Sequence, residues 1–366
     1  MHQDKSRNLL SLFQSYEEFN LKNRTVMAPM TRYSCDKEGI PSKKLEEYYI
    51  RRAQNDISLI ITESAAINNS DSLGYIGGLQ FHNENHVDAW KPIIKKKIQS
   101  TGSKVWIQLF HPGRLTVKEI TGGKVLAPTN IKPYNSKSYW RQDLNGALVH
   151  FQTKTPFKVP EALTQPEIKR ICNEFVNSAK KAEKAGFDGI EIHGAHGYLI
   201  HQFNSLNTNI RDDEYSVDGN YKFISEIIKE CKKSISIPIS YRISNHFVDN
   251  SFIRYNENKY NIPVLIRKLD KLGIDVFHVS EINVESKMFG SQYSLSELIS
   301  LHTNKPMIVT GSVKTLKMAN QLLDRKGIEL IGFGRNLISN PDLLKKIRTG
   351  ERITDFNYSD HINLLY

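Results

Sequence analysis

Eight short apolar segments, rich in β-branched residues, recur along the chain and are mostly separated by stretches with helical periodicity. The strand-like segments are 25–30, 57–62, 104–110, 187–193, 237–243, 275–280, 306–310 and 329–333. The helical stretches are 42–56, 84–99, 164–185, 221–233, 262–272, 313–325 and 341–349. Strands that alternate with helices form a parallel sheet, and eight such units close into a barrel. The sequence therefore predicts an α/β protein, a (β/α)8 TIM barrel that forms a single domain over residues 1–366.

Two stretches add local detail to this prediction. Thr164 and Glu167 have the spacing of a capping box at the start of one helix, and Gly186 is placed to end it. Residues 111–160 are instead irregular and rich in Gly, Pro, Asn and Tyr. Because a connection of that length in a compact fold is usually functional or builds its own structure, we expect an excursion with a small hairpin there.

The composition is that of a globular protein with a substantial core, since 39% of the residues are hydrophobic and 24% are charged. The formal net charge of +11 raises the question of a nucleic-acid partner. The basic residues are scattered, however, and the lysine run at 95–97 falls in a predicted helix, as expected for a solvated face. We expect no nucleic-acid partner, although the positive balance favours anionic ligands such as phosphates.

The cysteine pattern and the lengths of the apolar runs indicate the cellular compartment. Cys35, Cys172 and Cys231 form no C-x-x-C motif, which argues against a zinc or iron–sulfur site and favours a reducing environment. The amino terminus lacks an apolar core of signal-peptide length, and no run of eighteen apolar residues occurs. The expectation is a cytoplasmic protein without a membrane segment.

The fourth strand-like segment ends in three chemically active residues, His193, His196 and Tyr198. In α/β proteins the loop after a strand faces the ligand, while the scaffold holds the strand itself. Two imidazoles and a phenol at one strand end can supply hydrogen-bond donors and a proton near neutral pH. Taken alone, the motif fits buried structural residues better than it fits a site, so the other strand ends are needed to decide.

Residues that could contact a ligand, most of them polar or glycine, also lie at the ends of most of the other strand-like segments. They are Pro29, Met30, Thr31, Glu63, Ser64, Gln108, His111, Arg242, Gly311, Ser312, Gly334 and Arg335. Because the carboxyl ends of barrel strands meet at one face, we expect one shared site. The last two loops are the usual phosphate-binding corner, where glycine lets backbone N–H groups approach an anion and Arg335 adds a bidentate fork.

Other barrel functions fit these residues less well. A metal-dependent hydrolase using His193 and His196 would need a third ligand, and the nearest acid, Glu191, lies on the same strand. A Schiff-base aldolase needs a lysine at a strand end, and none of these ends carries one. A non-catalytic nucleic-acid binder would explain the charge but not the strand-end residues. We therefore expect an enzyme without a metal.

The strand-end residues resemble the old yellow enzyme family of FMN-dependent NADH:flavin oxidoreductases and ene-reductases. The likeness runs from Leu12 to about Leu344 and rests on five blocks in order. They are LKNRTVMAPMTRY at 21–33, YYIRRA at 48–53, IQLFHPGR at 107–114, AGFDGIEIHGAHGYLIHQF at 185–203 and IGFGRNLISNPDL at 331–343. The resemblance implies an eight-stranded barrel that binds FMN non-covalently across its mouth and takes hydride from NADH or NADPH.

The resemblance also implies which residues bind FMN. The platform beneath the isoalloxazine ring corresponds to Ala28, Pro29, Met30 and Thr31, with Thr31 on the O4 side. Ser64, Gln108 and Arg242 correspond to a small residue near the ring, the amide at the pyrimidine edge and the cation beside N1 and O2. The phosphate loops correspond to Gly311, Ser312, Gly334 and Arg335. The chemistry agrees, because Arg242 stays charged beside a reduced flavin and Gln108 can both donate and accept.

On the substrate side, the resemblance implies that His193 and His196 hold a carbonyl oxygen, that Tyr198 donates a proton and that Tyr33 is an aromatic contact. The implied reaction reduces activated C=C bonds of α,β-unsaturated carbonyls or related electrophiles. The alternative is a quinone, nitro-compound or flavin reductase without a true ene-reductase role. The choice of NADH or NADPH stays open, and so does a homo-oligomer.

The chain departs from the family pattern in four places. The segment SVDGNYKF at 216–223 is shorter than usual and lacks an arginine, and residues 246–261 are polar and rich in asparagine. Ser280-Glu281 stands where a small Ser-Gly pair is usual, which places a charge at one wall of the flavin site. The tail after Arg352 has no arginine of the kind that reaches into a partner's site in one subgroup.

Overall fold

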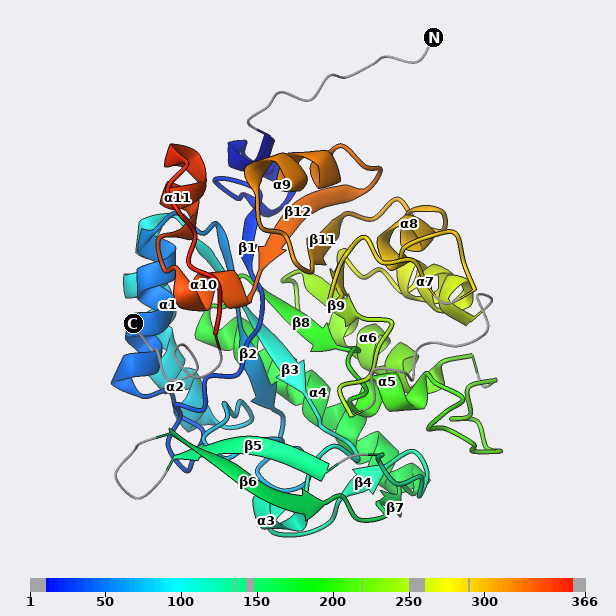
Figure 1. Cartoon of the computed structure of the whole chain (residues 1–366). Coiled ribbons are helices and arrows are strands. Elements are labelled where there is room, and N and C mark those ends of the chain that lie inside the picture. The colour runs from blue at the N-terminus through cyan, green and yellow to red at the C-terminus, as the bar shows by residue number, and fades with distance from the viewer. Residues whose placement is uncertain are drawn as a thin grey trace.

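The computed structural model describes residues 11–134, 136–142, 148–218, 220–249, 261–288 and 290–357. Within these residues, eight parallel strands close into a barrel in the order β1-β12-β11-β10-β9-β8-β3-β2. Their bounds are β1 Thr25–Met27, β2 Leu59–Ala66, β3 Lys104–Phe110, β8 Gly189–His193, β9 Ile239–Ile243, β10 Val276–Ser280, β11 Met307–Thr310 and β12 Ile328–Phe333. Helices surround these strands (Figure 1). The barrel predicted from the sequence is confirmed.

The larger helices lie between successive strands and cover the outside of the barrel. They are α1 Lys43–Gln54, α2 Glu84–Ile93, α4 Gln165–Ala185, α6 Lys222–Ser234, α7 Asn261–Lys271, α8 Leu295–Ser300, α9 Leu316–Leu323 and α11 Leu343–Thr349. Helix α4 begins at the predicted capping box, where Thr164 and Glu167 exchange hydrogen bonds, and ends at Gly186 with φ +93°. Only glycine adopts that backbone conformation readily.

The inside of the barrel is apolar at one end and polar at the other. Near the amino ends of the strands, the barrel side chains Leu59, Trp106 and Leu330 form a buried cluster, against which Phe19 packs. Nearer the carboxyl ends, Gln108 and Glu191 are almost completely buried polar residues. Barrel interiors are usually filled by bulky aliphatic side chains, so a buried polar layer needs internal partners.

The irregular excursion after β3 builds structure of its own, as its length suggested. It carries α3 Lys118–Thr121, β4 Leu126–Ala127, β5 Ser136–Gln142, β6 Leu148–Pro156 and β7 Glu161–Ala162. Strands β5 and β6 form an antiparallel hairpin, and β4 pairs with β7. Figure 1 shows the hairpin below the carboxyl end of β3.

Some predicted element bounds are wrong. Strand β1 ends at Met27, and not at residue 30, because the chain then crosses the barrel mouth, where Arg32 N–H donates to the Glu63 carboxylate. Strand β2 continues to Ala66, so Glu63 and Ser64 lie within the strand and not beyond it. Helix α2, which contains Pro92, ends at Ile93, and the chain continues as a π turn over Ile94–Ile98.

Besides the short helices α3 and α5 Leu199–Phe203, the sequence analysis did not predict two further helices. The first is α8, which starts at a capping box between Ser294 and Glu297, a signal that could have revealed it. The second is α10 Arg335–Ser339, a short turn after β12. None of the helices in the described part of the chain combines the length and the apolar character needed to cross a bilayer. The first ten residues, residues 250–260 and the tail from 358 lie outside the described residues.

Candidate active site at the barrel mouth

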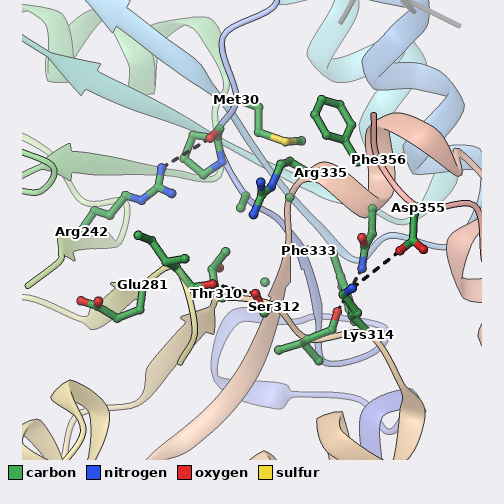
Figure 2. A pocket seen from close by; sticks show the side chains of 18 residues that line it. Met30, Arg242, Glu281, Thr310, Ser312, Lys314, Phe333, Arg335, Asp355 and Phe356 are labelled. Atoms are coloured by element: carbon green, nitrogen blue, oxygen red, sulfur yellow. Dashed lines mark hydrogen bonds and ion pairs between the residues drawn. The ribbon is translucent and has the colours of Figure 1, made fainter. Parts of the chain in front are cut away.

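A cavity of about 330 Å³ opens at the carboxyl ends of β1, β9, β11 and β12. Its lining includes many of the residues predicted to contact the cofactor, namely Ala28, Pro29, Met30, Arg242, Gly311, Ser312, Gly334 and Arg335. Figure 2 shows Arg242, on β9, and Arg335, at the start of α10, both at this cavity. The structure therefore brings the first, fifth, seventh and eighth strand ends together at one cavity, of a size typical for small-molecule sites.

One end of this cavity, here called the anion corner, is formed by Gly311, Ser312, Lys314 and Arg335. The loop after β11 runs so close to the loop after β10 that a Cβ on Gly311 would lie 2.6 Å from the carbonyl oxygen of Glu281. Ser312 has φ +54° and donates its hydroxyl to the carbonyl of Ile282 at 2.7 Å. These contacts hold the loop where its backbone and the Arg335 guanidinium face the same space.

The sequence analysis did not predict that Lys314 belongs to the anion corner. It lines the cavity and forms an ion pair with Asp355 at 3.7 Å, in which both side chains are largely exposed. Figure 2 shows this pair at the end of the cavity away from Arg242. A basic residue soon after a glycine turn is common in sequences, so it does not by itself indicate a site. The partner, Asp355, becomes evident only from where the fold places the carboxyl-terminal segment.

Arg242 lies on the opposite side of the cavity and is buried. Its guanidinium donates to the hydroxyl of Ser280 at 2.9 Å and weakly to the carbonyl of Pro29 at 3.5 Å. Its Nε finds no hydrogen-bond acceptor among the described residues. Burial lowers the pKa of Arg242, but an arginine keeps its charge in proteins. A buried cation with an unused donor is suited to an acceptor brought by a ligand.

His193, His196 and Tyr198 lie together at the end of β8, as predicted. The ring of His193 lies 5.4 Å from that of His196 and 4.9 Å from that of Tyr198, centroid to centroid. Burial lowers the pKa of both histidines well below the usual value, and the nearby Arg242 charge acts in the same direction. Both imidazoles are therefore neutral at neutral pH.

Local hydrogen bonds indicate which nitrogen of each imidazole carries the proton. His193 Nδ1 accepts from the backbone N–H of Ala195 at 3.3 Å, so its proton is on Nε2. Ser280 accepts from Arg242 and can donate its own hydrogen to His196 Nε2, which lies 3.2 Å away, and in that arrangement the His196 proton is on Nδ1. A neutral imidazole has one N–H donor, and Ser280 links His196 to Arg242, which lines the cavity.

Tyr198 is part of an aromatic group that the sequence did not reveal. Its hydroxyl hydrogen-bonds the hydroxyl of Tyr75, which comes from the loop after β2. Tyr75 in turn contacts the ring of Tyr33 edge to face at 5.6 Å. The predicted substrate-side Tyr33 is therefore placed beside Tyr198 through Tyr75. We call His193, His196, Tyr198 and Tyr75 the histidine wall.

Glu281 lines the cavity, in agreement with the charge expected at this wall. Its carboxylate accepts the backbone N–H of Asn245 and lies 3.5 Å from Nδ1 of His246. The His246 ring is 5.1 Å from that of His196. The start of the unusual segment 246–261 is thus held beside the histidine wall, an arrangement with no local signal in the sequence.

The remaining predicted contacts lie near the cavity but do not line it. Ser64 and Gln108 are register partners on β2 and β3, and Gln108 donates its side-chain amide to Glu191 at 2.8 Å. Thr31 is partly buried in the segment after β1. In the described residues, no group of three or more His, Cys, Asp or Glu side chains is arranged to hold a metal ion.

Comparison with known proteins assigns this arrangement to a family. The model of the NADH:flavin oxidoreductase / NADH oxidase family matches residues 13–353. The chain belongs to this family, the old yellow enzyme family. It is an FMN-dependent oxidoreductase that takes hydride from a nicotinamide, as the sequence resemblance implied.

Three relatives illustrate the likeness. The NADPH dehydrogenase of Clostridium acetobutylicum is 34% identical over 343 residues, which is 91% of this chain and 93% of that protein. Morphinone reductase in complex with tetrahydroNAD has a TM-score of 0.82 at 25% identity, covering 95% of this chain and 93% of that one. The old yellow enzyme homologue from Zymomonas mobilis has a TM-score of 0.79 at 27% identity, covering 96% and 99%.

The cavity of this old yellow enzyme family member fits FMN on its own chemistry. The anion corner suits a phosphate, because glycine turns and the Arg335 guanidinium face one space. The unused Nε of the buried Arg242 suits the polar edge of a flavin ring. The buried segment of Ala28 and Pro29 between these ends offers a surface on which a ring can lie.

Proposed function

We propose that the protein is an NAD(P)H-dependent ene-reductase that reduces activated C=C bonds of α,β-unsaturated carbonyls or related electrophiles. The observation that carries this proposal is a buried phenol, Tyr198, held beside two neutral imidazoles. Its substrates would be small molecules. The three cysteines are free and buried, which is in keeping with the reducing cytoplasm that we propose as its location.

We assign the cofactor contacts by position. Arg335, with the backbone around Gly311, Ser312 and Gly334, would hold the FMN phosphate. Arg242 would contact the N1 and O2 side, Gln108 the pyrimidine edge and Thr31 the O4 side. Ala28, Pro29, Met30 and Ser64 would border the ring.

FMN, once reduced by the nicotinamide, supplies the hydride that reaches the β-carbon of the substrate. As charge moves onto the carbonyl oxygen, Nε2–H of His193 and Nδ1–H of His196 would donate to it. Each preorganised donor of this kind contributes on the order of 10²-fold in rate. Because both imidazoles are neutral, they stabilise the charge by donation and keep their own protons.

Tyr198 would give the proton that the α-carbon needs. Burial raises the pKa of Tyr198, and the hydrogen bond with Tyr75 opposes this rise. The phenol therefore stays protonated at neutral pH and is available as an acid. Reducing a quinone or a nitro group needs no protonation at carbon, so Tyr198 distinguishes the two candidate reactions.

The test is Tyr198→Phe in the FMN-loaded enzyme. We expect normal FMN binding and near-normal reduction by the nicotinamide, with C=C reduction of cyclohexenone lowered roughly 10²–10⁴-fold. Quinone reduction should persist. Stopped-flow absorbance would follow the reductive and oxidative half-reactions separately.

A matched control is Tyr215→Phe, which removes another buried tyrosine hydroxyl, one that donates to Glu226 away from the mouth. It should leave both half-reactions intact. If Tyr198→Phe reduces cyclohexenone as fast as the wild type, the proton comes from elsewhere and the proposed ene-reductase chemistry of Tyr198 is wrong.

A further inference from the structure

Glu191, in the middle of β8, is a completely buried carboxylate with three side-chain donors. Gln108 Nε2 donates to it at 2.8 Å, the Ser240 hydroxyl at 2.9 Å and His278 Nδ1 at 2.7 Å. These donors come from three different barrel strands. A carboxylate that is removed from water needs such donors to remain ionised.

The charge state of this cluster follows from its surroundings. Burial raises the pKa of Glu191, but His278, Arg242 and the Ser240 hydrogen bond together bring that pKa below its usual value. Burial lowers the pKa of His278, and the opposing effect of Glu191 is smaller. Three side-chain donors and the nearby Arg242 cation support an ionised Glu191, and burial favours a neutral His278 that donates its Nδ1–H to Glu191.

The cation that balances Glu191 is then Arg242. Ser240 and Arg242 are two residues apart on β9 and so face the same side of the sheet. Arg242 is the register partner of His193 on β8 and of His278 on β10. Glu191 and Arg242 each shift the pKa of the other in the direction expected for opposite charges.

Glu191 also fixes the Gln108 amide and is linked to the cavity lining through His278. It engages the amide nitrogen of Gln108, and no donor to the amide oxygen occurs among the hydrogen bonds of the described residues. His278 Nε2 lies 2.9 Å from the hydroxyl of Thr310, which lines the cavity. With His278 protonated on Nδ1, Thr310 donates its hydrogen to Nε2.

We propose that Glu191 is a positioning residue that balances the charge of Arg242 beneath the flavin and sets the orientation of the Gln108 amide. This inference rests on the cofactor contacts proposed above for Arg242 and Gln108. A reduced flavin carries more negative charge than an oxidised one, so an anion below the site disfavours reduction. Removing the charge of Glu191 should leave Arg242 uncompensated and make the bound FMN easier to reduce.

The test compares the midpoint potential of bound FMN in the wild type and in Glu191→Gln. We expect at least a tenfold shift in the two-electron equilibrium toward reduced FMN, which is about 30 mV more positive. Glu191→Asp keeps the charge and should keep the potential. A potential that is unchanged in Glu191→Gln, or equally shifted in Glu191→Asp, would overturn the proposal.

Glu63 provides a matched control on the neighbouring part of the barrel. It is also fully buried, but burial raises its pKa to about 8, so most of it is neutral at pH 7. The amide in Glu63→Gln keeps an acceptor for the Arg32 N–H and removes little charge. This variant should leave the potential in place at pH 7. A shift as large as that of Glu191→Gln would mean that any buried substitution moves the potential.

A second measurement covers the case in which Glu191→Gln does not fold. The double variant Glu191→Gln/Arg242→Gln removes both charges, so it should be more stable in urea than either single variant. If the stability loss of the double variant equals the sum of the losses in the two single variants, Glu191 and Arg242 do not balance each other's charge. If wild-type protein does not retain FMN, or if Arg242→Gln leaves the potential unchanged, the cofactor assignment is what fails. If Arg242→Gln lowers the potential while Glu191→Gln does nothing, this inference alone fails.

Discussion

The two ends of the barrel mouth are built in different ways. In the anion corner, the Lys314–Asp355 pair is exposed, with side chains 66% and 90% accessible, and the loops are held by backbone contacts. Beside the histidine wall, Arg114 and Asp249 form an ion pair at 3.0 Å in which each side chain is only 1% accessible. The exposed charged side chains of the anion corner can change partners with solvent or a ligand. The buried Arg114–Asp249 pair beside the histidine wall instead depends on contacts inside the protein.

This difference fits the roles proposed above for the two ends. A phosphate brings its own charge and needs only donors that face it, which flexible surface cations can supply. A substrate oxygen and carbon must be met by particular nitrogen and oxygen atoms, so the side chains that carry them must be held from several directions. Arg114 helps to do this, because it also donates to the carbonyl of Ile131 and so joins the segment just after β3 to two other loop positions.

The largest predicted effect is on stability, in Arg114→Leu. Removing Arg114 takes the cation out of a buried ion pair, so we expect unfolding to cost about 3–5 kcal/mol less. Urea denaturation of the apoprotein measures this. The matched variant Lys314→Leu breaks the exposed pair and should change stability by less than about 1 kcal/mol. Equal losses in the two variants would refute the distinction between the two ends.

The next effect is on cofactor affinity, in Arg335→Ala. A charge-assisted hydrogen bond contributes roughly 1.5–3 kcal/mol, so the Kd for FMN should rise about ten- to a hundredfold. Flavin fluorescence measures the Kd, and urea denaturation should show little change in the stability of the apoprotein. An unchanged Kd would place the phosphate elsewhere than in the anion corner.

A pH effect on stability should arise from His201, which lies three residues after Tyr198 of the histidine wall, and not from the anion corner. His201 is fully buried and accepts the Gly197 N–H at 3.0 Å, and burial lowers its pKa well below 6.5. The unfolded chain therefore binds a proton below about pH 6.5 that the folded chain refuses, so stability falls as the pH decreases. The apoprotein should lose up to about 1.4 kcal/mol per pH unit through this residue.

Urea midpoints and slopes measured from pH 7 down to pH 5 test this pH effect. His201→Asn keeps an acceptor for Gly197 but does not titrate, so its stability should fall less steeply as the pH decreases. Ser312→Ala in the anion corner should retain the wild-type slope. A slope in His201→Asn equal to that of the wild type would show that His201 is already protonated in the fold.

The smallest predicted effect concerns Tyr75→Phe. The hydrogen bond between Tyr75 and Tyr198 lowers the pKa of Tyr198, so its loss should raise that pKa further and weaken Tyr198 as an acid. A neutral hydrogen bond contributes about 0.5–1.5 kcal/mol, so C=C reduction should slow by roughly two- to tenfold. The oxidative half-reaction measures this, and nicotinamide-driven reduction serves as the internal reference. An effect as large as that of Tyr198→Phe would make Tyr75 a direct participant.

Much of the anion corner could be predicted from the sequence, because its signals are local. Gly311 and Ser312 follow one strand directly, and Gly334 and Arg335 follow another. The same holds for the barrel itself and for the capping box of α4, since both depend on residues close together along the chain. His193, His196 and Tyr198 were likewise identifiable from a single strand end.

Only the tertiary structure shows which residues lie around the histidine wall and which surround the buried carboxylate of Glu191. Tyr75, His246 and Asp249 reach their partners from loops more than thirty residues away in sequence. No periodicity or turn signal encodes such contacts, because they depend on how two loops meet at a closed barrel. The same reason applies to Glu191. Its sequence context is an ordinary buried strand, and only closure of the barrel places Gln108, Ser240 and His278 around its carboxylate.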